Sequence, residues 1–474
     1  LRNGATRLES GVRRGSGGVG NKGIRESGMP RWQRLTVHFR FPVLLFPSRL
    51  CLTQPATILA RLADLSNASS HRDSTVQSPT SESLAGIQAA AQTCEELKSW
   101  LLDEAFTRWW AQGADQERGG FHERLRLDGT PLDEPRRARV NPRQVYCYSL
   151  AEDLGWTGPA QRAVQHGIDY FLKHYRRPDR LFRGLVNADG TAVTERAVLY
   201  DQAFALLGLA SAYETSSGEE YRRMARELHD VLRAQLRHSQ AGFEESQPHI
   251  LPLISNSHMH LLEASLEWMD LDHEPLWTVL AEEIVNLALT RFIDPSSGFV
   301  LEFFDREWRP SAGPEGRAVD PGHQYEWAWL LSRWVARNPE VAAASQAQQA
   351  ALKLVSLTEQ HRVDCERGVV VNALSTDKAV RDPQARLWPQ TERIKAACTM
   401  AELTGEAGYW TAANEAARAL MKYLNTPLPG LWYDKMTVEG AFIDQPAPAS
   451  SFYHIVCAIA ELEHATKRAG TRTG

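Results

Sequence analysis

The chain has 474 residues, of which 43% are hydrophobic and 23% are charged. These are ordinary values for a globular protein, and they exclude a wholly disordered chain, collagen and a coiled coil. The 53 Lys and Arg residues against 58 Asp and Glu residues give a net charge of −5. No overall basic field is therefore present to hold nucleic acid.

Residues 1–88 are predicted to be a disordered or non-native leader that ends in a linker. Residues 1–28 are rich in Gly and Arg without an apolar period, and residues 65–87 are rich in small and polar side chains. An apolar run over residues 39–52 faintly resembles a signal peptide, but Pro and Arg interrupt it, and it is too short to span a bilayer. We therefore expect residues 89–474 to form the catalytic domain.

The 6 cysteines are far apart, and none belongs to a Cys-x-x-Cys pair. This spacing indicates neither a zinc knuckle nor a disulfide framework. Cys147 and Cys457 lie within apolar helical patterns, where a thiol usually acts as a small hydrophobe. We therefore expect a cytoplasmic protein.

A glycine next to an apolar residue recurs about every sixty residues along the body of the chain. The apolar members are Phe121, Phe182, Phe243, Phe299, Val369 and Leu431. Each is followed by an extended stretch and two helical patterns, of which the first is apolar on nearly all sides and the second has a polar face. Six such pairs can form an open superhelix or a ring, but an open array needs polar end caps, and none is visible. We therefore predict an all-α fold, an (α/α)6 barrel of six helical hairpins with short β-hairpins and loops at the active-site end.

Chemically distinctive side chains recur between 17 and 24 residues after each of these markers. They are Arg143, Tyr200, His260, His323, Trp388 and His454. Because a similar phase in a closed repeat means a similar height, they should converge on one mouth of the barrel. A helix start also favours polar caps, but Arg, His and Trp are poor N-caps. A lone His on an apolar helix is more often a structural residue, whereas three at one phase favour a functional site.

Two of these histidines are followed by a glutamate three residues later, as in His260 and Glu263, and His323 and Glu326. This spacing puts both side chains on one helical face, so each Glu could hold or polarise groups near its His. His258 and His260 also form a His-x-His pair, but residues two apart on a helix point to nearly opposite sides and cannot chelate one ion. We therefore expect no metal and no cofactor.

A cluster of His with Arg and Trp suits proton transfer on a sugar. Aromatic faces stack on the C–H surfaces of a sugar, Arg and Glu bind hydroxyls, and His exchanges a proton near neutral pH. Aldose–ketose isomerisation and 2-epimerisation need these groups and a cationic donor for the enediolate oxygen. The sequence contains no Gly-x-Ser-x-Gly elbow, no Cys-nucleophile signature and no Gly-rich nucleotide loop in a strand-turn-helix context.

Five segments, within about residues 90 to 468, resemble the N-acylglucosamine 2-epimerase superfamily. They are Arg143-Gln-Val-Tyr-Cys-Tyr-Ser, Asn256-Ser-His-Met-His260-Leu-Leu-Glu-Ala, Gly322-His323-Gln-Tyr-Glu326-Trp-Ala-Trp-Leu, Trp388-Pro-Gln-Thr-Glu392 and Tyr453-His454. The resemblance implies an (α/α)6 barrel and a metal-free enediol mechanism.

The resemblance also implies a role for each matching residue. His454 and His323 are similar to the acid/base pair at carbons 1 and 2, and Glu326 is similar to the partner of His323. His260 resembles a third histidine implicated in ring binding or opening, and Arg143 resembles the arginine that binds the substrate oxygen. Sugar-binding residues are expected at Tyr200, Asn256, Glu263, Trp388 and Glu392.

The segment before His454 is more similar to the isomerase branch of this superfamily than to cellobiose 2-epimerase. We therefore expect an isomerase of the mannose–fructose type that acts on a monosaccharide, as a monomer or homodimer, with no nucleic-acid or membrane partner. An N-acylglucosamine 2-epimerase or other sugar 2-epimerase is the alternative within the family. Outside the family, a non-catalytic sugar-binding barrel stays open, as does a glycoside hydrolase that uses Asp201 with Glu326 or Glu392.

Overall fold

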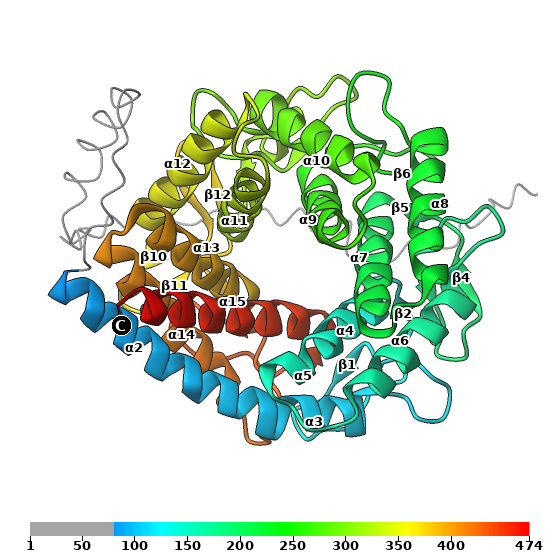
Figure 1. The fold of residues 1–474 in the computed structure, drawn as a ribbon, viewed down its shortest axis with the longest axis horizontal. Coiled ribbons are helices and arrows are strands. Elements are labelled where there is room, and N and C mark those ends of the chain that lie inside the picture. Colours follow the sequence, from blue (N-terminus) through cyan, green and yellow to red (C-terminus); the bar gives the residue numbers. More distant parts are fainter. Residues whose placement is uncertain (1–79, 474) are drawn as a thin grey trace, which may run out of the picture. The chain divides into compact units, whose positions relative to one another are not determined.

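The computed structural model describes residues 80–473, in which six helices form an inner ring and six more surround it (Figure 1). The inner helices are α4 (Val140–Ser149), α7 (Leu199–Ser216), α9 (Ser255–Leu271), α11 (Pro321–Arg337), α13 (Trp388–Thr404) and α15 (Ala449–Thr473). The outer helices are α2 (Ser81–Ser99), α6 (Ala160–Tyr175), α8 (Glu219–Gln235), α10 (Pro275–Leu287), α12 (Ala344–Arg362) and α14 (Ala407–Leu424). Shorter helical segments are α3 (Phe106–Arg108), α5 (Ala151–Leu154), a 3-10 turn (Glu315–Arg317) and π-helical turns at Trp100–Ala105, Trp109–Gly113 and Ala288–Phe292. This arrangement confirms the predicted (α/α)6 barrel.

The pattern of apolar residues explains which helices lie inside. In α7 every residue from Asp201 to Ala212 is buried, because the helix is enclosed by its neighbours on all sides. In α8 only one face is buried, and charged side chains cover the other. Inner and outer helices therefore alternate along the chain as the sequence predicts.

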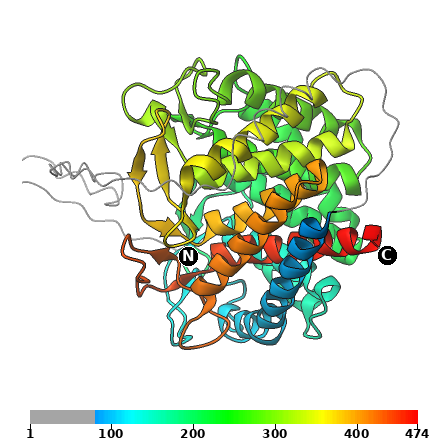
Figure 2. The ribbon, with the colours of Figure 1, turned by 90° about the vertical axis from the view of Figure 1, so that its left-hand side faces the viewer.

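Short strands of two or three residues gather at one end of the barrel (Figure 2). They are β1 (Arg124–Leu125), β2 (Arg136–Arg137), β3 (Leu185–Val186), β4 (Ala192–Thr194), β5 (Ala197–Val198), β6 (Ser246–Gln247), β7 (Leu253–Ile254), β8 (Phe303–Phe304), β9 (Ala318–Val319), β10 (Val363–Asp364), β11 (Val369–Val370), β12 (Ala373–Ser375), β13 (Val380–Asp382), β14 (Ala385–Arg386), β15 (Lys435–Met436) and β16 (Ala447–Pro448).

These strands join each repeat to the next. The strand just before an inner helix pairs antiparallel with a strand of the following repeat, in the pairs β2–β3, β5–β6, β7–β8, β9–β12 and β14–β15. The last strand, β16, returns to pair with β1, with Arg124 opposite Pro448. The repeats therefore form a closed ring, and each inner helix begins at a position set by a strand pair.

A buried polar side chain near the start of five inner helices binds the backbone of the preceding repeat marker. The acceptors are Asn141 for Phe121 N–H, Gln202 for Phe182 N–H, His258 for Phe243 N–H, Gln324 for Val300 N–H and Gln390 for Val370 N–H, at 2.8–3.0 Å. We call these five acceptors the anchor residues. By this hydrogen bond, Val300 and Val370 are the structural equivalents of Phe121. The predicted markers Phe299 and Val369 are therefore wrong by one residue. The prediction followed the Gly-apolar dipeptide, whereas the repeat is defined by the residue whose N–H is bound.

The folded body begins earlier than predicted. Helix α2 starts at Ser81, where Thr80 caps it by accepting a hydrogen bond of 3.1 Å from the Ser83 N–H. Thr93 donates to Asn414 of α14 at 2.7 Å, and a Cβ on Gly86 would lie 2.9 Å from the Trp410 Cβ. Residues 81–88 therefore belong to the barrel and not to a linker, because their helix packs closely on α14.

The remaining predictions for the N-terminal region, including the apolar run over residues 39–52, lie outside the described residues. Among the described helices, none is both long and apolar enough to cross a membrane.

We expect a chain that starts at Ala89 to melt at a lower temperature than a chain that starts at Thr80. The shorter chain loses the cap and the first two turns of α2, which pack against α14. Thermal denaturation of the two purified chains measures the difference. Equal melting temperatures would contradict the structural role of residues 80–88.

Candidate active site

The ten predicted site residues lie within the first three turns of the six inner helices, at the end of the barrel where the strands lie. They are Arg143 on α4, Tyr200 on α7, Asn256, His260 and Glu263 on α9, His323 and Glu326 on α11, Trp388 and Glu392 on α13, and His454 on α15. Contacts described below connect nine of them. The tenth, Asn256, lies one turn before His260, and its buried side-chain oxygen has no hydrogen-bond partner within residues 80–473.

His323 is held by a carboxylate that the sequence analysis did not identify. Its Nδ1 lies 2.8 Å from Oε2 of Glu302, a residue between the Val300 marker and β8. Burial alone lowers the pKa of His323, but the Glu302 and Asp320 carboxylates outweigh it and raise the pKa to about 9. His323 is therefore a cation at neutral pH with Nε2 left for a ligand.

His454 is also held by a carboxylate at Nδ1, but its imidazole is neutral rather than cationic. Its Nδ1 lies 2.8 Å from Oε1 of Glu392, and the other oxygen of Glu392 lies 2.6 Å from the Lys395 ammonium. Burial, together with the Arg143 and Lys395 cations, lowers the pKa of His454 well below its ordinary value. At neutral pH this imidazole is neutral and can accept a proton at Nε2.

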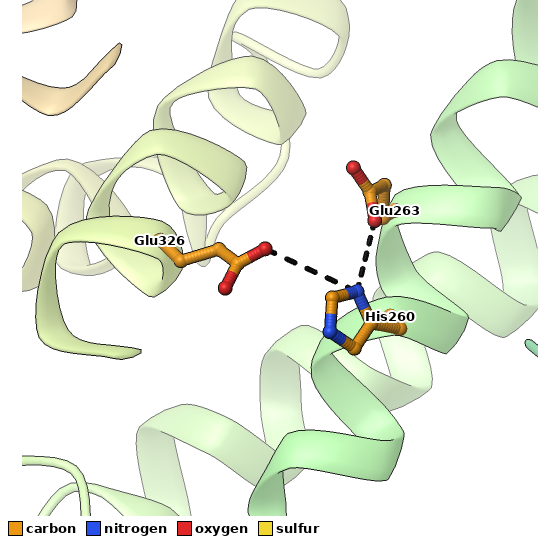
Figure 3. A group of neighbouring side chains, drawn as sticks. All are labelled: His260, Glu263 and Glu326. Atoms are coloured by element: carbon orange, nitrogen blue, oxygen red, sulfur yellow. Dashed lines mark hydrogen bonds and ion pairs between the residues drawn. The ribbon is translucent and has the colours of Figure 1, made fainter. Parts of the chain in front are cut away.

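His260 forms a third histidine–carboxylate pair, which Figure 3 shows beside Glu326. Its Nδ1 lies 3.0 Å from Oε2 of Glu263, and the Tyr453 hydroxyl donates to the other oxygen of Glu263. Burial lowers the pKa of His260 to about 4. The ring packs against Tyr200, with 5.0 Å between the centroids, so it is a neutral group in the wall of the site.

Glu326 points from α11 toward His260 on α9, with 4.0 Å between its Oε1 and the His260 Nδ1 (Figure 3). Neither of its oxygens has a hydrogen-bond partner among the described residues. Burial and the Glu392 carboxylate raise the pKa of Glu326 well above its ordinary value, which favours the protonated acid. Such a group can both donate to and accept from a ligand hydroxyl.

The predicted partnership of Glu326 with His323 is therefore wrong. The three-residue spacing does place both side chains on one side of α11. His323, however, lies in the first turn of the helix, where Glu302 reaches it from the strand end, whereas Glu326 lies one turn deeper and faces α9. The hydrogen-bonded partner is Glu302.

Trp388 lies between His323 and His454, two of the three histidines that a carboxylate holds. Its ring centroid is 5.1 Å from that of His323 and 5.5 Å from that of His454. A Cβ on Gly322 would come within 2.4 Å of the indole, so the glycine makes room for this position. The half-buried indole offers an apolar surface between two polar groups, a combination that is common in small-molecule sites.

Arg143 supplies a buried cation on the opposite wall. Its Nη2 donates to the Tyr200 hydroxyl at 2.7 Å, and its guanidinium lies 4.1 Å from the centroid of the Phe204 ring. Its Nε is buried and has no hydrogen-bond partner in the part of the chain that the structure describes. One donor of this arginine therefore stays available to an oxygen-rich ligand.

Two groups of possible metal ligands share Glu326: His260 with Glu263, and His454 with Glu392. In each group the ligand atoms lie within 4.8 Å of one another. Two of the carboxylates have other partners, since Glu263 accepts a hydrogen bond from Tyr453 and Glu392 forms an ion pair with Lys395. The fixed Lys395 ammonium disfavours a second cation at Glu392. His258 takes no part, because its two ring nitrogens bind the backbone of Phe243 and Ile254.

The sequence contains a signal that could have found Glu302. A glutamate stands two residues after the structural marker in three repeats, as Glu123, Glu245 and Glu302. All three are buried. Glu123 accepts a hydrogen bond from Arg137, Glu245 accepts one from Ser257, and Glu302 is hydrogen-bonded to His323. Lys395 was also missed, although its place three residues after Glu392 puts both on one helical face.

Comparisons with known proteins show which proteins this chain is similar to. The sequence model of N-acylglucosamine 2-epimerase (GlcNAc 2-epimerase) matches residues 119–458. A protein of Rhizobium meliloti named mannose-6-phosphate isomerase is 45% identical over 380 residues, which is 79% of this chain and 97% of the relative. D-mannose isomerase of Thermobifida fusca is 28% identical over 66% of this chain and 80% of that protein. The solved structure of cellobiose 2-epimerase from Spirochaeta thermophila superposes with a TM-score of 0.73 at 23% identity, over 81% of this chain and 98% of that one.

We expect the substitution Glu302→Gln to lower the pKa of His323 from its value of about 9. The amide keeps the shape of the side chain but removes the negative charge that favours the imidazolium. An NMR titration of the histidine C–H signals measures the pKa, with His323→Asn used to assign the signal. An unchanged pKa would contradict the assignment of Glu302 as the partner.

Proposed function

Because the chain belongs to the N-acylglucosamine 2-epimerase family, we propose that it interconverts an aldose and a ketose of the mannose–fructose type by proton transfer through an enediol. It is an isomerase-class enzyme of this family that acts on a sugar. One observation carries the proposed mechanism. Two histidines on either side of Trp388 are held by carboxylates at Nδ1 and have pKa values shifted in opposite directions. The proposed catalytic domain is the barrel itself.

In the proposed reaction, neutral His454 removes the proton from carbon 2 of the open-chain aldose. The electron pair of that C–H bond forms the double bond between carbons 1 and 2, while oxygen 1 takes a proton from cationic His323. The 2-hydroxyl then returns a proton to His323 as the carbonyl forms at carbon 2. The double-bond pair takes the proton from His454 to carbon 1, and both histidines recover their starting states.

The other walls of the site support this reaction. Arg143 offers its Nε, which none of the residues in the described range binds, to the enediolate oxygen, where negative charge develops. Glu326 and Asn256 have buried oxygens that lack partners among the described residues and can bind sugar hydroxyls. The resemblance implied ring binding or opening by His260, and its neutral state and its place beside Glu326 agree with such a role.

The names of two relatives favour the mannose skeleton. One is called mannose-6-phosphate isomerase and the other D-mannose isomerase, and they differ in the phosphate at carbon 6. That phosphate is remote from carbons 1 and 2, so the same proton transfers serve both substrates. The proposed substrate is therefore mannose or mannose 6-phosphate, and the assay should include both sugars. A monomer or homodimer in the cytoplasm stays a prediction.

We expect the purified protein to convert mannose or mannose 6-phosphate to the corresponding fructose without added nucleotide. N-acetylglucosamine should give no N-acetylmannosamine, because the proton returns to carbon 1 and not to carbon 2. Chromatographic analysis of parallel incubations measures each product. Turnover of N-acetylglucosamine alone would replace the proposed isomerase with the epimerase, and release of monosaccharide from an oligosaccharide alone would replace it with a glycoside hydrolase.

We expect His454→Asn and His323→Asn each to lower kcat by about a hundred- to ten-thousand-fold, the usual range for a general acid or base. Sugar binding should stay largely intact, because neither substitution removes the walls around Trp388 and Arg143. Glu326→Gln should cost less, because the amide can still bind a hydroxyl. Steady-state kinetics with a binding measurement separate the two effects. Substantial activity of His454→Asn would contradict its role as the base.

We expect activity to survive exhaustive chelation with EDTA, because the Arg143 and His323 cations can stabilise the enediolate without a metal. The assay compares treated enzyme with and without added divalent ions. Activity that returns only when a divalent ion is added would contradict the metal-free mechanism and favour one of the Glu326-centred ligand groups.

A further inference from the structure

Lys395 is a fully buried lysine in the wall of the site. Its ammonium lies 2.6 Å from Oε2 of Glu392 and 3.8 Å from the centroid of the Trp329 ring. Lysine is rarely buried without a partner, because taking its charge out of water is costly. The Glu392 carboxylate and the indole face together replace the lost water.

Lys395 is paired with one of three neighbouring buried carboxyl groups. Glu263, Glu326 and Glu392 are all buried, at about 1% exposed or less, and come from three adjacent inner helices. Burial favours the protonated form of each, but the hydrogen bond from His260 lowers the pKa of Glu263 to about 2, so that Glu263 is a carboxylate. Lys395 pairs with Glu392, and Glu392 is the one that binds His454.

We propose that Lys395 is a positioning residue that keeps Glu392 as a carboxylate and thereby holds His454 in the tautomer with its proton on Nδ1. A carboxylate can only accept a hydrogen bond, so the Nδ1 beside it must carry the proton. The lone pair is then on Nε2, where the proposed base needs it. The effect on catalysis rests on the proposed function, whereas the tautomer of His454 does not depend on it.

Without the lysine charge, the same contact would favour the wrong tautomer. Burial raises the pKa of Glu392, and Lys395 is the first influence that opposes this rise. A protonated Glu392 would donate its proton to Nδ1, which moves the imidazole proton to Nε2 and removes the base. The activity of such an enzyme returns only at a pH high enough to ionise Glu392.

Several other charged or titratable groups face this pair and stay unchanged in the test. They are His260 and Glu263 on α9, Glu326 on α11, Arg143 on α4, and Cys457 on α15. Because these groups are common to all variants below, a difference in pH dependence reports the loss of the Lys395 charge.

The central test is the substitution Lys395→Met, which keeps most of the length of the side chain and removes its charge. We expect kcat at pH 7 to fall at least about tenfold, the factor for a shift of one pKa unit, while KM changes little. The acidic limb of the pH profile should move to higher pH, with activity partly restored in alkaline buffer. A purely structural role would lower activity equally at every pH, and that result would overturn the proposal.

The matched control is Lys98→Met, which removes a partly buried lysine paired with Glu463 away from the site. We expect this variant to keep the kcat and pH profile of the unmodified enzyme. A shift of its acidic limb equal to that of Lys395→Met would also overturn the proposal, because the effect would then be general.

A double variant keeps the test decisive if Lys395→Met folds poorly. Glu392→Gln combined with Lys395→Met removes both members of the buried pair and leaves no orphaned charge. If Lys395 acts through Glu392, adding Lys395→Met to Glu392→Gln should change kcat by less than about threefold. A further loss as large as in the single variant would show that Lys395 acts by another route.

A measurement without sugar separates this inference from the proposed function. Nitrogen-15 NMR of labelled histidine distinguishes the two imidazole tautomers, and His454→Asn assigns the signal. We expect the Nδ1–H form at neutral pH and a shift toward Nε2–H in Lys395→Met. Nδ1–H in both proteins would overturn the inference even if mannose is turned over. The expected shift in a protein that turns over no sugar would sustain the inference and reject the function.

Discussion

The pairing of each short strand with the next repeat is the constraint on which the site depends. A two-residue strand precedes every inner helix, and its antiparallel partner belongs to the neighbouring repeat, with β16 returning to β1. Six helices therefore begin at matched heights around one axis. Residues that follow the helix starts by similar numbers of positions therefore meet at one end of the barrel. His454 and Arg143 do so although they are hundreds of residues apart in sequence, because α15 and α4 are neighbours where the ring closes.

Neighbouring charges then give similar buried side chains different chemistry. Three histidines each place Nδ1 against a glutamate at 2.8–3.0 Å, yet only His323 is a cation at neutral pH. The difference lies in the second charges nearby, since Asp320 reinforces Glu302, whereas Lys395 and Arg143 oppose a positive charge on His454. An acid and a base can thus operate together from the same residue type, because their pKa values are moved apart by fixed neighbours.

The sequence predicts the architecture well, since the sixty-residue period and the enclosed apolar helices follow from repeat length and periodicity alone. It also predicts which helix positions meet, because phase in a closed ring is geometric. The partner of His323 could not be predicted in this way. Spacing within one helix pointed to Glu326, whereas Glu302 reaches the imidazole from another segment. Gln324 of α11 holds that segment nearby by binding both the N–H and the C=O of Val300. The start of α2 was missed because its small and polar residues resemble a linker.

On three inner helices, a residue that holds the fold is followed two positions later by a residue that faces the site. Anchor residues Asn141, His258 and Gln390 are each followed two residues later by Arg143, His260 and Glu392. Residues two apart on a helix point to nearly opposite sides, so one side chain binds the neighbouring backbone while the other faces the axis. Chemistry can then change at the second position while the first keeps the repeat in register. For this reason His258 and His260, which look alike in sequence, serve the barrel and the site respectively.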